Sequence, residues 1–69
     1  MNSKVEECLA IEDRLNARGE YCYNTPLGPK RWRFDFGTFG TSARNIEAEG
    51  DFVDAWHASL IQRSAELEE

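Results

Sequence analysis

The chain of 69 residues has few of the features that build cross-linked or membrane-spanning proteins. Its two cysteines, Cys8 and Cys22, are too few for a disulfide scaffold and lack the spacing of metal ligands, so we expect free thiols. No apolar run approaches the ~20 residues that a membrane-spanning helix needs. Residues 1–7 also lack the pattern of a signal peptide. These absences predict a cytoplasmic protein with no membrane partner.

Basic residues are scarce as well. Eight Lys and Arg stand against thirteen Asp and Glu, which gives a net charge of -5. A protein that binds nucleic acid or an anionic membrane directly needs a basic surface to neutralise phosphates. We therefore expect no direct nucleic-acid binding, and we expect an acidic chain to favour basic partners.

Hydrophobic residues nevertheless make up 41% of the chain and include two Trp, four Phe and two Tyr, which excludes a disordered tail. A chain of this length encloses one small core. We therefore expect residues 1–69 to form a single α+β domain.

Apolar residues at helical spacing predict a helix at each end of the chain. The first is expected over residues 4–18, with Gly19 as a left-handed stop. The second opens at Asp51 as N-cap, and we expect its last turn to fray because acidic residues there oppose the helix dipole. The expected apolar stripes are Val5, Cys8, Ile11 and Leu15 on the first helix and Val53, Trp56, Leu60 and Leu67 on the second.

Three strands are expected between the helices. Residues 20–24 form the first, and the Pro and Gly of residues 25–29 predict a turn after it. Strict alternation of aromatic and charged side chains in residues 31–36 is typical of a strand with one buried face. Residues 43–49 form the third strand, in a hairpin centred on Gly40 in which opposed residue numbers sum to 80.

In this register Trp32, Phe34 and Phe36 point toward the core and the charged residues face solvent. Each helix has one apolar stripe to bury, so both helices are expected on the aromatic face. The predicted fold is α-β-β-β-α, a three-stranded antiparallel sheet with both helices on one face. On the outer face the register predicts the ion pairs Arg33 with Glu47 and Arg31 with Glu49.

Three acidic residues of the second and third strands share that outer face: Asp35, Glu47 and Glu49. Clustered carboxylates are what a divalent ion needs. With the sequences around them, RWRFDF at 31–36 and IEAEG at 46–50, they resemble the central hairpin of phage-type nucleases of the PD-(D/E)XK superfamily. The resemblance spans residues 6–50. It implies a metal-dependent nuclease in which Asp35 and Glu47 bind Mg²⁺ and Glu49 stands where a Lys is common.

The chain departs from that family in lacking a lysine after Glu47 at the family spacing and a basic groove for DNA. The alternative interpretation is that Glu47 and Glu49 only neutralise arginines across the hairpin. We favour this alternative, and therefore expect no metal site and no cofactor, Mg²⁺ being needed only by a nuclease. His57 is the one histidine, without partners at ligand spacing, so we expect no catalytic or metal role for it.

The order of elements is also similar to that of the double-stranded-RNA-binding domain, with Gly28-Pro29 before the aromatic strand and Ala55 in the last helix. That family holds phosphate with lysines at the start of the last helix. Here the same stretch, residues 51–54, reads DFVD. We therefore expect a shared fold at most, without RNA binding.

Negative charge gathers in the last third of the sequence. Four of these residues, which we name the acidic strip, surround the expected start of the last helix: Glu47, Glu49, Asp51 and Asp54. Such a strip could mimic the phosphates of DNA and occupy a basic groove on another protein. The alternative is a solvated face that keeps a small domain soluble.

By size, acidity and single core, the chain resembles the small phage-encoded inhibitors, anti-CRISPR proteins among them, which bind a nucleic-acid-handling complex. The resemblance implies a non-enzymatic interaction protein that acts in the host-cell cytoplasm and uses the acidic strip against its partner. The nuclease described above, with Asp35, Glu47 and Glu49 as catalytic residues, is the main alternative. A structural subunit that forms a homodimer through an exposed sheet edge is a third.

Overall fold

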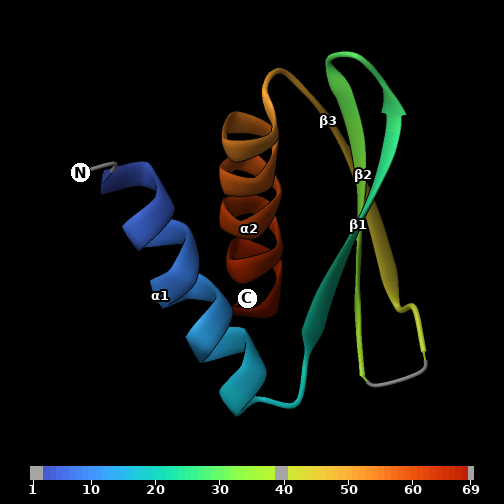
Figure 1. Cartoon of the computed structure of the whole chain (residues 1–69). Helices are drawn as coiled ribbons and strands as arrows, with labels where there is room; N and C mark the ends of the chain where they lie inside the picture. The colour runs from blue at the N-terminus through green and yellow to red at the C-terminus, as the bar shows by residue number, and fades with distance from the viewer. Residues whose placement is uncertain (1–2, 39–40, 69) are drawn as a thin grey trace.

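The computed structural model of the chain describes residues 3–38 and 41–68 and has the predicted order of elements. The three strands form one antiparallel sheet in the order β1-β2-β3, and both helices lie on the same side of it (Figure 1). The α-β-β-β-α fold is thus confirmed, while the predicted hairpin centre, Gly40, lies outside the described residues. The elements are α1 (Ser3–Ala17), β1 (Tyr21–Gly28), β2 (Arg31–Gly37), β3 (Arg44–Glu49) and α2 (Phe52–Glu68).

α1 ends at Ala17, two residues before Gly19, the glycine that the sequence predicts as its stop. Gly19 has a φ of 84°, a left-handed conformation that is costly for a residue with a Cβ. Its N–H donates to the Asn16 carbonyl at 2.9 Å, and the N–H of Glu20 donates to the Leu15 carbonyl at 2.9 Å. These two hydrogen bonds form a Schellman motif, which turns the chain from α1 into β1.

β1 is longer than predicted. We expected a strand over residues 20–24 and a turn over residues 25–29, but the strand continues to Gly28. Pro26 is tolerated inside it because β1 is an edge strand, where one of the two rows of backbone groups needs no partner. A bulge between Pro26 and Gly28 shifts the register just before the turn at residues 29–30.

β2 and β3 pair in the predicted register. Phe34 is opposite Ile46 and Trp32 is opposite Ala48. As a result Phe34 and Phe36 are fully buried, while Trp32 is half-buried and packs against the edge of the core. The strict alternation of β2 therefore identified the inner face of the sheet correctly.

α2 buries the predicted stripe in part: Leu60 is fully buried, and Trp56 and Leu67 pack against the core. Its buried residues are Ala55, Ser59 and Leu60, and Val53 and Trp56 are only partly buried. Ala55 and Ser59 are one helical turn apart, so two small side chains meet the neighbouring elements along one line. The Ser59 hydroxyl donates to the Trp56 carbonyl at 2.8 Å, which satisfies this buried polar group.

The core lies between the inner face of the sheet and the two helices. In Figure 1 α2 lies between α1 and the sheet, and α1 meets the sheet at β1.

Both cysteines are free thiols, as predicted, and burial raises the pKa of Cys22 to about 12. In the described part of the chain, neither helix is long and apolar enough to cross a membrane. The buried hydrophobic residues are Cys8, Ile11, Leu15, Phe34, Phe36, Ile46, Ala55 and Leu60.

Truncation of the central aromatic should remove most of the stability of so small a domain. We expect Phe34→Ala to lower the free energy of unfolding by about 3–5 kcal/mol, because it leaves a cavity in the middle of the core. Leu9→Ala is the matched control, since Leu9 is 51% exposed and should change stability by less than about 0.5 kcal/mol. Urea denaturation measures both, and equal midpoints for the two variants would contradict the assignment of the core.

Candidate functional site

The acidic strip runs from the outer face of β3 to the first turn of α2, and its four residues are exposed. Gly50, with a φ of 117°, makes the turn between these two elements. Its N–H donates to the Lys30 carbonyl at 2.8 Å, which holds the β1–β2 turn beside the start of α2. The first bond of the helix runs from the Ala55 N–H to the Asp51 carbonyl at 2.9 Å, so Asp51 stands at the predicted N-cap position.

Three of the four strip carboxylates are paired with cations from distant parts of the chain. The sequence analysis missed Lys4 and Lys30, which lie on α1 and in the β1–β2 turn, far from the strip in chain order, and it paired Arg31 of β2 with Glu49 instead of Glu47. The acidic strip is therefore a surface of mixed charge. The pairs are Lys4 with Asp54 at 2.7 Å, Arg31 with Glu47 at 2.6 Å, and Lys30 with Asp51.

The pairs change the proton affinity of the groups that form them. The hydrogen bond from Lys4 lowers the pKa of Asp54, and the same bond raises the pKa of Lys4. The hydrogen bond to Asp51 likewise raises the pKa of Lys30. Among the described residues Glu49 makes no ion pair and is exposed, so it is the strip carboxylate that is open to a partner without any rearrangement.

An open hollow lies at the start of α2. Lys4, Asp51, Val53 and Asp54 line it, so one ammonium and two carboxylates surround a partly buried apolar side chain. A long side chain with an apolar stem and a charged end, such as arginine, matches this lining.

The ion pairs on the outer face do not follow the predicted straight pairing. The register places Arg31 opposite Glu49, but the guanidinium of Arg31 reaches diagonally to Glu47. Arg33 is opposite Glu47, but its Nε lies 3.7 Å from Asp35 Oδ2 on its own strand. The two predicted pairs were wrong because long side chains reach diagonal and same-strand neighbours as easily as the opposed residue.

The residues proposed for metal binding are spread over this face. Asp35 is opposite Asn45 and lies 3.5 Å from the Ser42 hydroxyl, which donates to it. Glu47 faces the Arg31 guanidinium instead of Asp35. Within residues 3–38 and 41–68, no group of three or more His, Cys, Asp and Glu side chains is placed to hold a metal ion. The structure thus does not gather Asp35, Glu47 and Glu49 into a ligand set.

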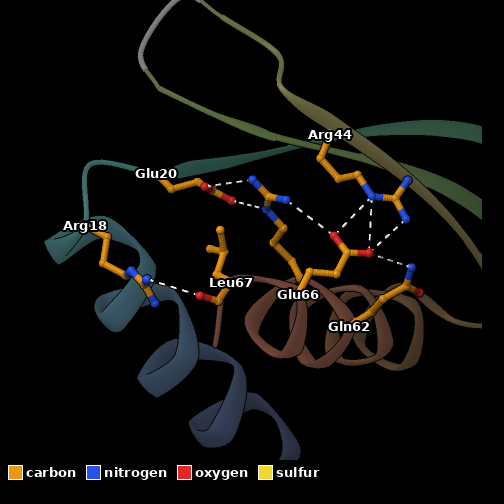
Figure 2. A network of polar contacts seen from close by, with 7 residues as sticks. Arg18, Glu20, Arg44, Gln62, Glu66 and Leu67 are labelled. Carbon is orange, nitrogen blue, oxygen red and sulfur yellow. Dashed lines mark hydrogen bonds and ion pairs between the residues drawn. The ribbon is translucent and has the colours of Figure 1, made fainter. Parts of the chain in front are cut away.

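A second charged cluster, absent from the sequence predictions, lies at the other end of α2 (Figure 2). Arg63 donates to Glu20 at the start of β1, with Nη2 to Oε2 at 3.1 Å, and only 13% and 12% of the two side chains are exposed. Glu66 accepts from Arg44 of β3, with Oε2 to Nη2 at 2.9 Å, and from Arg63 at 3.3 Å. The cluster therefore ties α2 to both outer strands of the sheet.

Polar contacts at this end of α2 change the pKa of Glu66 and satisfy a carbonyl of the last turn. Hydrogen bonds from Arg44, then from Gln62 and Arg63, lower the pKa of Glu66 to about 2. The Arg18 guanidinium donates to the Leu67 carbonyl at 3.3 Å and so compensates the helix dipole. The helix continues to Glu68, and cations from other elements that the sequence does not reveal reach this end. The last residue of the turn that was predicted to fray, Glu69, lies outside the described residues.

Two further acidic side chains hold α1 against α2. Glu12 accepts from Trp56 Nε1 at 2.9 Å. Glu7 Oε1 lies 3.2 Å from Nε2 of His57. His57 is thus part of the contact between the helices.

The cluster at the end of α2 predicts a pH-dependent stability. Because the folded pKa of Glu66 lies below the ordinary 4.5, its contribution is complete above pH 4.5 and is lost as the pH falls toward 2. The melting temperature of Glu66→Gln should therefore lie below that of wild type at neutral pH and approach it near pH 2. Glu68→Gln, an exposed change at the same helix end, should follow the wild-type curve. A constant offset for Glu66→Gln at every pH would contradict this role.

Because Asp35, Glu47 and Glu49 lie apart, we expect divalent metal ions to leave the stability of the protein unchanged. Millimolar Mg²⁺ or Mn²⁺ should leave the melting temperature almost unchanged, because no ligand set is stabilised. The protein should also fail to nick plasmid DNA. Metal-dependent cleavage that disappears in Asp35→Ala would instead support the nuclease alternative.

Comparison of the chain with protein-family models, with curated proteins and with solved structures gave no match.

Proposed function

We propose that the protein is a non-enzymatic interaction protein whose acidic strip binds the basic surface of a nucleic-acid-handling protein or complex and blocks it. The observation that carries the proposal is the presentation of four exposed carboxylates by β3 and the start of α2, with Gly50 and its hydrogen bond fixing the turn between them. Small phage-encoded inhibitors of the anti-CRISPR type act in this general way, and the host-cell cytoplasm is where such a partner is met.

The internal ion pairs of the strip do not prevent this role. The side chains of Lys4 and Lys30 are 44% and 70% exposed, and pairs this exposed contribute little to stability. An arginine binds a carboxylate through two parallel hydrogen bonds, which an ammonium does not offer. An arginine of the partner can therefore displace Lys4 or Lys30 at small cost.

Charge exchange of this kind suits a partner that normally binds phosphates. A groove for nucleic acid presents several cations that are paired with mobile counterions in its free state. The acidic strip would replace these counterions, while Lys4, Lys30 and Arg31 would turn toward solvent. The hollow lined by Val53 offers an apolar contact for the stem of one incoming side chain.

No observation favours the nuclease alternative. Asp35 lies closest to Arg33 and Ser42, and Glu47 to Arg31, so the structure gives these carboxylates neutralising neighbours in place of shared ligands. Binding to a basic partner uses Glu47 and Glu49 as separate carboxylates and does not require them to meet at one point.

Charge reversal of the strip should slow association. The variant Glu47→Lys/Glu49→Lys/Asp54→Lys should lower the association rate with the partner about tenfold or more, because steering by opposite charges is lost. The wild-type rate should fall as salt screens the charges over a Debye length of about 8 Å at physiological ionic strength. Surface plasmon resonance with a partner captured from host extract, at two salt concentrations, measures both effects.

The matched control is Glu6→Lys/Asp13→Lys/Glu68→Lys, which makes the same change in net charge at three exposed positions outside the strip. It should retain most of the wild-type rate, and circular dichroism should show both variants folded. Equal rates for the two variants would mean that net charge alone, and no particular surface, determines binding.

A further inference from the structure

The sheet has two edges, and they differ in how well they resist pairing with another strand. β3 is six residues long and carries Arg44, Glu47 and Glu49, so charge discourages the approach of a second strand. β1 is eight residues long and contains no charged residue, and within the described part of the chain it pairs with β2 alone. Proteins usually protect an exposed edge strand by charge, proline, a bulge or a covering element.

Among the described residues, protection of these kinds is found in the second half of β1. Pro26 and the bulge between Pro26 and Gly28 interrupt the regular strand there. In the first half, Tyr21 and Tyr23 are 40% and 50% exposed on the outer face. Asn24 is opposite Phe34, which places it on the helix side of the sheet, yet it is exposed, so the helices leave this position uncovered, whereas Cys22 on the same face packs against the core. Residues 21–25 therefore form a regular and uncharged stretch of the edge on which Tyr21, Tyr23 and Asn24 are exposed.

We propose that the protein forms a symmetric dimer in which residues 21–25 of β1 pair antiparallel with the same residues of a second copy. Centred on Tyr23, this pairing places the two Tyr23 side chains opposite one another at the twofold axis. Tyr21 is then opposite Thr25, and Cys22 is opposite Asn24. The two sheets become one continuous sheet with the helices of both copies on the same face.

A second copy is the occupant that the charge distribution favours. Each chain has a net charge of -5, so self-association requires a surface where like charges do not meet, and residues 21–25 provide one. Every pair in the proposed register is uncharged, and pairs of tyrosine with tyrosine or threonine are favourable across antiparallel strands. A basic partner gains nothing electrostatic from this edge.

The dimer is independent of the proposed function. The acidic strip lies on β3 and the start of α2, and β2 separates β3 from β1. Pairing through β1 would leave both strips exposed. A contact of one short strand buries little surface, so we expect a dimer that dissociates at about micromolar concentrations.

Sedimentation of the full chain over a range of concentrations tests the proposal. Wild type should move from 7.9 kDa toward twice that mass as concentration rises. Tyr23→Lys should raise the dissociation constant at least about tenfold, because two like charges meet at the twofold axis. Leu27→Lys is the matched control: Leu27 is 43% exposed on the same strand but lies beyond Pro26, so this variant should dimerise as wild type does.

Substitutions of opposite charge at position 23 distinguish loss of the dimer interface from loss of the fold. Tyr23→Lys and Tyr23→Glu should each be monomeric alone, and an equimolar mixture should recover the dimer because Lys then faces Glu at the axis. The proposal would be overturned if wild type stayed monomeric at several hundred micromolar or if the mixture stayed monomeric. It would also be overturned if Leu27→Lys weakened dimerisation as much as Tyr23→Lys does.

Discussion

The burial of Phe34 and Phe36 in the core shared with the two helices determines how the other elements are arranged. Both side chains are fully buried, and they lie on the central strand, which is the one strand that pairs on both sides. Because side chains alternate along a strand, burying these two sends Arg33 and Asp35 to the outer face. The same alternation fixes the register of β3 and so sets where the acidic strip begins.

The sequence was sufficient to predict these local features, because periodicity and glycine conformation report on them directly. The inner face of β2, the register with β3 and the helix stop at Gly19 were all predicted correctly. The extension of β1 through Pro26 was missed because the tolerance for proline depends on edge position, which only the strand order shows.

Charge pairing was the part that sequence could not predict. Lys4 meets Asp54 and Glu20 meets Arg63 across most of the chain, and no pattern in the sequence marks either pair. A strip that looked acidic in chain order is in fact compensated by cations of other elements. Since the pairs of the strip are exposed while the Glu20–Arg63 pair is largely buried, the cluster at the end of α2 contributes to stability, and the strip remains the proposed binding surface.

In the proposed complex, cations of the partner replace Lys4 and Lys30 at the acidic strip. Titration of the ¹⁵N-labelled protein with its basic partner tests it most directly by nuclear magnetic resonance. We expect shifts at the amides of Gly50 and Asp51, together with release of the Lys4 and Lys30 ammonium groups from their carboxylates. Shifts confined to β1 or to the outer side of α1, with both lysine pairs intact, would contradict this replacement.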